Sequence, residues 1–125
     1  MNRFTAGVVA LILCSGVTAR EQVAQFTGAG SSTTAEFEVT APWILDWRVN
    51  SDFQGSMAIE ISLVDGDSGF HKGLILQTKR PNNGVRLFRE SGRYRFRISS
   101  TLALWDLKVE ELSQEEAEQY KPRGK

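Results

Sequence analysis

The chain has 125 residues, among them 15 basic and 15 acidic side chains, one histidine and one cysteine. This length fits one domain, and the balance of charge gives no general preference for a polyanion such as a nucleic acid. With a single cysteine and a single histidine, the chain has neither a disulfide framework nor the ligands of a zinc site.

The first segment has the pattern of a cleavable signal peptide. Arg3 supplies a positive charge, and residues 6–13 (AGVVALIL) form an uninterrupted run of small and apolar side chains. This run is far shorter than the roughly 20 residues that span a bilayer. We therefore expect residues 1–19 to be removed after Ala19, and we expect a periplasmic or secreted protein without a membrane span.

Cys14 offers a second way to end this segment, because bacterial lipoprotein signals place a lipidated cysteine after a small residue. Here the bulky Leu13 precedes it, which disfavours lipidation and leaves it as the alternative. Cleavage after Ala19 would leave a mature domain without cysteine, whose stability must come from its core alone. An exported domain of this kind fits a bacterial export route.

Apolar and polar residues alternate through most of the remaining chain, as they do in half-buried β-strands. Residues 57–63 show the alternation most clearly, whereas Ile44 falls on the polar face of its strand with Asp46 and Arg48. A parallel sheet buried under helices would instead show continuous apolar runs. Besides a strand over residues 74–78, the apolar positions of the expected strands are, in chain order, Ala24, Phe26, Phe37, Val39, Trp43, Leu45, Trp47, Val49, Met57, Ile59, Ile61, Leu63, Val85, Leu87, Tyr94, Phe96, Ile98, Trp105, Leu107 and Val109.

Residues that favour turns separate these strands. They lie at 28–32, 65–69, 81–84 and 91–92, where glycine, proline, asparagine, aspartate and serine are concentrated. Many short strands divided by such turns are typical of sandwiches and barrels. The pattern predicts an all-β domain over residues 20–112, an antiparallel sandwich or small jelly roll of about seven to eight strands.

The alternation ends at Ser113. Ser113 and Glu116 have the spacing of a capping box, in which each side chain hydrogen-bonds the backbone N–H of the other residue. We expect one or two helical turns to Tyr120, followed by a charged tail. Residues 113–125 are therefore predicted to be a short C-terminal helix and tail.

Five segments carry a family likeness: Phe26-Thr27-Gly28-x-Gly30, Thr34-x-x-Phe37-x-Val39, Trp43-x-Leu45-x-Trp47, Gly92-x-Tyr94-x-Phe96 and Trp105-x-Leu107-x-Val109. Together they resemble small exported bacterial β-sandwich domains of an uncharacterised family. The resemblance covers nearly the whole mature chain and consists of strand and turn residues. It therefore implies a fold and no particular activity.

The loop at residues 65–69 contains the sequence Gly-Asp-Ser-Gly, which is similar to the segment around the nucleophilic serine of chymotrypsin-like proteases. That chemistry needs a histidine beside the serine and a buried aspartate beside the histidine. The single histidine, His71, lies in the same loop as Ser68, and a double barrel needs about twice this chain. We therefore interpret the loop as a non-catalytic turn.

The same loop offers Asp65 and Asp67 as metal ligands. A calcium loop of the EF-hand type also needs further oxygen ligands and a distal glutamate, which do not follow here. We expect no metal and no cofactor, with a calcium site completed by a distant carboxylate as the alternative.

Tryptophan side chains can stack on sugars, which suggests a glycan platform. Trp43, Trp47 and Trp105, however, share faces with aliphatic residues, and large aromatic side chains dominate core energetics. We expect all three in the core. Phe53 and Phe70, in expected loops, are the better candidates for exposed contacts.

Charge is distributed unevenly, with basic residues concentrated between Lys72 and Arg97 and acidic residues between Asp106 and Glu118. Three arginines fall on the polar face of one strand. They either pair with carboxylates such as Asp106 and Glu110 on the next strand, which we favour, or form a basic stripe for an anionic partner. The candidate binding residues are Arg86, Arg89, Arg93, Arg95 and Arg97.

No set of residues in the sequence meets the requirements of catalysis or cofactor binding, so we expect a non-enzymatic protein. The hypothesis is an exported β-sandwich that binds an anionic envelope component or a protein partner, and not nucleic acid. The alternatives are a structural or accessory subunit of an envelope or secretion assembly, a glycan-binding domain, and a hydrolase whose carboxylates meet across strands. Fold alone does not decide among them.

Overall fold

The computed structural model describes residues 21–120. The expected signal peptide, its cleavage after Ala19, Cys14 and the tail at 121–125 therefore lie outside the described residues. The elements of the described part are β1 (Glu21–Gly28), β2 (Ser32–Thr33), β3 (Phe37–Val39), β4 (Trp43–Asn50), β5 (Ala58–Asp65), β6 (His71–Thr78), β7 (Asn82–Phe88), β8 (Gly92–Thr101), β9 (Leu104–Glu111) and α2 (Gln114–Gln119).

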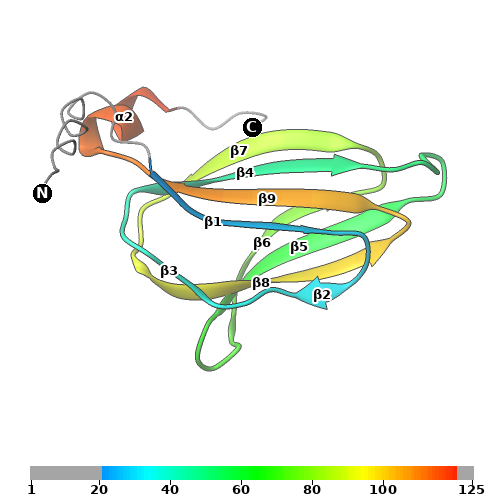
Figure 1. Cartoon of the computed structure of the whole chain (residues 1–125), viewed down its shortest axis with the longest axis horizontal. Coiled ribbons are helices and arrows are strands. Elements are labelled where there is room, and N and C mark those ends of the chain that lie inside the picture. The colour runs from blue at the N-terminus through cyan, green and yellow to red at the C-terminus, as the bar shows by residue number, and fades with distance from the viewer. Residues whose placement is uncertain (1–20, 121–125) are drawn as a thin grey trace, which may run out of the picture.

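The strands form two antiparallel sheets that face each other as a sandwich (Figure 1). One sheet has the order β1-β9-β4-β7, and the other has the order β2-β8-β5-β6, with β3 also paired to β8. The predicted all-β antiparallel sandwich with a short C-terminal helix is thus confirmed. The described strands number nine because two short pieces, β2 and β3, follow one another along the same edge of β8.

The chain crosses from one sheet to the other at most of its connections. Among the described strands, β5 and β6 alone are both consecutive in the chain and hydrogen-bonded to each other. β8 and β9, which the sequence suggested as neighbours, belong to different sheets. Leu102 and Ala103 make the corner between them, and Leu102 adopts a positive φ of 54° there. The apolar faces of both strands reach the core from opposite sides.

The core lies between the sheets and is rich in aromatic rings. Trp43 on β4 stacks on Phe88 of β7, with ring centroids 4.2 Å apart and planes 11° from parallel. Phe37 of β3 packs on Phe96 of β8 at 4.9 Å, and Tyr94 contacts Trp43 across the two sheets at 5.7 Å. Such pairs add to the free energy gained from burial, so this cluster joins the two sheets.

The tryptophans follow the prediction for two positions of three. Trp43 is 0% and Trp105 5% exposed, which confirms them as core residues. Trp47 is half-buried and packs against the same core from its rim. Its indole N–H donates a hydrogen bond to Oδ1 of Asn82 at 2.8 Å.

The turn predicted at residues 81–84 is wrong for its last three residues, which open β7 and pair with β4. Gly84 lies opposite Trp47 in this pairing. Gly28, predicted to begin a loop, likewise closes β1 opposite Trp105. Both glycines are strand residues beside a large indole, so they mark close packing and not a change of chain direction.

Ile44 is buried, with 1% exposed, although its strand position indicated the polar face. It belongs to a second apolar cluster with Leu112 and Ala117, and through Ala117 it packs against α2. The predicted capping box begins this helix: the hydroxyl of Ser113 accepts a hydrogen bond from the backbone N–H of Glu116 at 3.0 Å, and Glu116 Oε1 accepts one from the Ser113 N–H at 3.1 Å. The cap places the helix over Ile44.

Candidate functional site

The structure separates the five candidate arginines into two groups. Arg93, Arg95 and Arg97 lie on β8, on the face of the five-stranded sheet that points away from the core. Arg86 lies on β7, in the other sheet, and Arg89 directly follows that strand. The five side chains therefore do not form one continuous stripe.

Two of the three arginines of β8 lie within ion-pair distance of carboxylates, but not of the ones that the sequence suggested. Arg93 lies 3.9 Å from Glu36 and 4.0 Å from Glu38, and Arg95 lies 4.0 Å from Glu36. The expected partners, Asp106 and Glu110, lie on β9 in the opposite sheet. Arg93 and Arg95 thus pair with carboxylates on or next to an adjoining strand, as expected, but that strand is β3 and not β9.

Arg95 and Arg97 also hold the loop at residues 65–69. Nε of Arg95 donates to the Gly66 carbonyl at 3.1 Å and its Nη1 to the Thr34 carbonyl at 3.3 Å. Nη2 of Arg97 donates to the Gly69 carbonyl at 3.4 Å. These side chains therefore have a structural use.

The Gly-Asp-Ser-Gly loop is organised by Asp65. Its Oδ2 accepts hydrogen bonds from the backbone N–H and the hydroxyl of Ser68 at 2.8 and 2.9 Å, and from the N–H of Asp67 at 3.1 Å. The first of these bonds contributes most to lowering the pKa of the Asp65 carboxyl below its ordinary 3.8. Within residues 21–120 no three His, Cys, Asp or Glu side chains gather closely enough to hold a metal ion.

Arg86 and Arg89 line a cleft of about 480 Å³ between β6 and β7. These two strands are edge strands of the two sheets, so the cleft lies along an open side of the sandwich. We call it the β6–β7 cleft. Its apolar floor is formed by side chains from four strands, Leu63, Ile75, Phe88 and Tyr94. Phe88 belongs to the aromatic cluster of the core through its stacking on Trp43. The floor is therefore an extension of the core.

The course of β6 explains why space remains here. Ile61 pairs with Leu76 and the next residue, Ser62, pairs with Leu74, so Ile75 has no partner on β5. This bulge re-aims the strand. Beyond it, Gly73 lies opposite Leu63 and lines the cleft, and a Cβ added to Gly73 would meet no atom within 4 Å. The missing side chain leaves the hollow open.

Three cations stand around this floor. Arg86 reaches from β7 to β6, where its Nη1 donates to the Leu74 carbonyl at 3.1 Å, and its guanidinium lies 5.2 Å from the centre of the Phe88 ring. Lys72 and Arg89 form no ion pair within the described part of the chain. Glu90 is the one carboxylate of the lining, so positive charge prevails.

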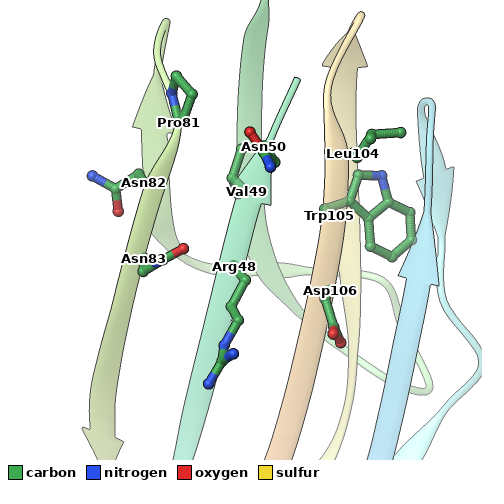
Figure 2. A pocket seen from close by; sticks show the side chains of 9 residues that line it. All are labelled: Arg48, Val49, Asn50, Pro81, Asn82, Asn83, Leu104, Trp105 and Asp106. Atoms are coloured by element: carbon green, nitrogen blue, oxygen red, sulfur yellow. The ribbon is translucent and has the colours of Figure 1, made fainter. Parts of the chain in front are cut away.

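A second hollow, of about 530 Å³, lies at one end of the four-stranded sheet, beside the end of β4 and the starts of β7 and β9. Figure 2 shows its lining from β7, β4 and β9. Although it is the larger hollow, its charges already have partners: Asp106 accepts a hydrogen bond from Gln25 at 3.0 Å, and Arg48 lies 3.9 Å from Asp46. The β6–β7 cleft is the better candidate because it combines an apolar floor with three cations and a single carboxylate, Glu90.

The sequence pointed to Arg86 and Arg89 but not to the rest of the cleft. Lys72 stood out only as part of a basic run, and Gly73 and Phe88 gave no signal, because β6 and β7 adjoin only after the chain has passed between the sheets. No helix among residues 21–120 is long and apolar enough to cross a membrane. No protein-family model matches the chain, and comparison with curated proteins found no similar sequence.

Proposed function

We propose that this protein is an exported, non-enzymatic binding module and that the β6–β7 cleft is its binding site. Its partner is an anionic component of the cell envelope or an anionic segment of another protein. The observation that carries the proposal is the apolar floor beside Lys72, Arg86 and Arg89. Ligand sites are typically concave, mostly apolar and supplied with a few polar groups that fix orientation.

Size and electrostatics support this assignment. The cleft volume of about 480 Å³ falls in the range of about 300–1,000 Å³ that small-molecule sites occupy. Lys72 and Arg89 are exposed, so their attraction for an anion acts through water and is screened within about 8 Å at physiological salt. Binding should therefore combine an apolar contribution that salt does not weaken with an ionic one that it does.

Export is the second part of the proposal and is supported by the signal-peptide pattern of residues 1–19. Expression of the full chain in a bacterium and intact-mass analysis of the periplasmic and extracellular protein should give a product that begins at Arg20. A product that retains Met1, or one with a lipid on Cys14, would contradict cleavage after Ala19.

Binding is tested by NMR on the mature protein titrated with fractionated envelope extract. The methyl signals of Leu63 and Ile75 should shift, since both side chains line the cleft. The variant Gly73→Leu should abolish the shifts because its side chain enters the open space. Gly55→Leu is the matched control, as Gly55 lies outside the cleft lining and also has open space around it.

If the extract shifts only signals outside the cleft, or if Gly73→Leu responds as the unaltered protein does, the site is wrongly assigned. Spectra and melting temperatures of both variants show whether the fold is intact. A loss of binding in Gly73→Leu counts only when this variant keeps a dispersed spectrum. If Gly73→Leu does not fold, the smaller substitution Gly73→Val is tested in its place.

A further inference from the structure

We infer that the ligand of the β6–β7 cleft is a single-chain amphiphile with an anionic head, either a carboxylate or a phosphate. The inference rests on the proposed function and narrows its ligand to one chemical class. The hydrocarbon chain lies on the floor beside Gly73, and the head faces Arg86, Arg89 and Lys72. Three properties of the cleft lead to this choice.

The first property is the chemistry of the floor. Leu63, Ile75 and Phe88 have no polar side-chain atom, and the hydroxyl of Tyr94 is already used, because it donates to the carbonyls of Glu90 and Ser91 at 3.1 and 3.3 Å. A peptide inserted here would bring backbone N–H and C=O groups that find no partner, at a considerable cost in free energy. A hydrocarbon chain has no such groups.

The second property is the space at Gly73. Its neighbour across the β5–β6 pair, Leu63, is buried, yet a Cβ on Gly73 would still be surrounded by open space. The hollow therefore reaches the backbone of Gly73 beside Leu63, where an aliphatic chain can contact the apolar floor. Such burial gains about 0.8 kcal/mol for each methylene group, which corresponds to about four-fold in affinity.

The third property is the placement of the cations. The hydrogen bond to the Leu74 carbonyl holds Arg86 across the opening between the two sheets. That bond uses one of the five N–H donors of a guanidinium, so others can bind a carboxylate or phosphate in the two-pronged manner that arginine favours. Arg89 and Lys72 lie on the same lining. The apolar floor and the charged opening of the cleft thus adjoin at Arg86. This arrangement matches an amphiphile, in which the hydrocarbon chain adjoins the charged head.

The test is a calorimetric and NMR titration of the mature protein with three probes of equal chain length, each below its micelle concentration. They are dodecanoate, dodecyl phosphate and dodecyltrimethylammonium. The two anions should bind one to one, shift the Leu63 and Ile75 methyl signals, and bind at least ten-fold more tightly than the cation. Comparison of the two anions shows which head group the site prefers.

A shorter probe and three protein variants test the roles of the hydrocarbon chain, of Gly73 and of Arg89 separately. Decanoate should bind about fifteen-fold more weakly than dodecanoate, because two buried methylene groups are lost. Gly73→Leu should abolish binding while Gly55→Leu leaves it unchanged. Arg89→Gln should weaken binding of the anions several-fold and should not weaken binding of the cationic probe, because it removes a positive charge from the lining. The fold should be retained, since the exposed Arg89 side chain makes no hydrogen bond or ion pair with the other described residues.

Two outcomes overturn the inference and are distinguishable from each other. The ligand class is wrong if no amphiphile binds, or if the cationic probe binds as tightly as the anions. The proposed binding function still stands in either case when an acidic peptide or envelope extract shifts the cleft signals. If none of these probes shifts the cleft signals, both the ligand class and the proposed site are wrong.

Discussion

The indole ring of Trp47 covers the backbone of Gly84, its cross-strand partner on β7. A Cβ built on Gly84 would lie 2.3 Å from Cζ2 of Trp47, far inside van der Waals contact. The hydrogen bond from the Trp47 indole to Asn82 fixes the ring in this position. Trp105 covers Gly28 in the same way, also at 2.3 Å. The glycines are needed because the rings occupy the space of their side chains.

Gly84→Ala should therefore destabilise the protein by about 1–3 kcal/mol through overpacking. The free energy of unfolding is measured by urea denaturation followed by tryptophan fluorescence. Gly55→Ala, where a Cβ meets no atom within 4 Å, should leave it nearly unchanged. In a Trp47→Leu background the additional cost of Gly84→Ala should largely disappear. An undiminished cost there would show that the indole is not its cause.

Leu102 at the β8–β9 corner combines a positive φ of 54° with a side chain that is 48% exposed. The left-handed region costs an L-residue about 1–2 kcal/mol, whereas glycine adopts it freely at some cost in chain entropy. Leu102→Gly should thus raise the free energy of unfolding by up to about 1 kcal/mol. Leu104→Gly, at a similarly exposed strand position, should lower it. Equal losses at both sites would contradict the role given to the backbone strain.

Arg95 and Arg97 should differ in their contribution to stability, although they share a strand and a face. Arg95 donates to two carbonyls and lies near Glu36, whereas Arg97 makes one long hydrogen bond of 3.4 Å to Gly69. Arg95→Ala should cost about 1–2 kcal/mol, since hydrogen bonds from a charged donor are lost at a partly exposed site. Arg97→Ala should cost under about 0.5 kcal/mol. Heparin retention that depends on Arg95, with an unchanged melting temperature, would instead favour a basic stripe for a partner.

Tyr94 should make the protein sensitive to alkali. Burial of its ring, followed by the negative charges of Glu90 and Asp65, raises the pKa of the phenol above its ordinary 10.0. The folded state therefore prefers the neutral phenol more than the unfolded state does. This contribution to stability is complete below pH 10 and is lost as the pH rises through the higher folded-state pKa. The hydroxyl lies at the start of β8 and bonds back to Glu90, the arrangement known in sandwiches as a tyrosine corner.

Urea midpoints measured between pH 8 and 11.5 should fall with pH in the unaltered protein and fall less in Tyr94→Phe. At neutral pH this variant should lose about 0.5–1.5 kcal/mol, the value of the hydrogen bond from its hydroxyl. Tyr120→Phe is the control and should keep the alkaline loss. A steep fall that persists in Tyr94→Phe would assign the effect to another group.

The sequence by itself determined the features that depend on near neighbours in the chain. Alternation in residues such as Tyr94, Phe96 and Ile98 predicted strands with one buried face, because successive side chains of a strand point to opposite sides. Ser113 and Glu116 predicted the start of α2, because a capping box is complete within four residues. Both predictions needed no knowledge of the rest of the fold.

Only the tertiary structure decided which strands adjoin. An apolar face on β9 is buried equally well in either sheet, so its alternation could not reveal that β3, and not β9, lies beside the arginines of β8. Consecutive strands pair often enough to make the hairpin a reasonable expectation, and here the corner at Leu102 prevents it. A second crossing, between β6 and β7, brings Gly73 and Arg86 together from opposite sheets. The cleft exists because two sheet edges lie side by side there. The alternation of apolar and polar residues along one strand does not indicate which other strand lies beside it.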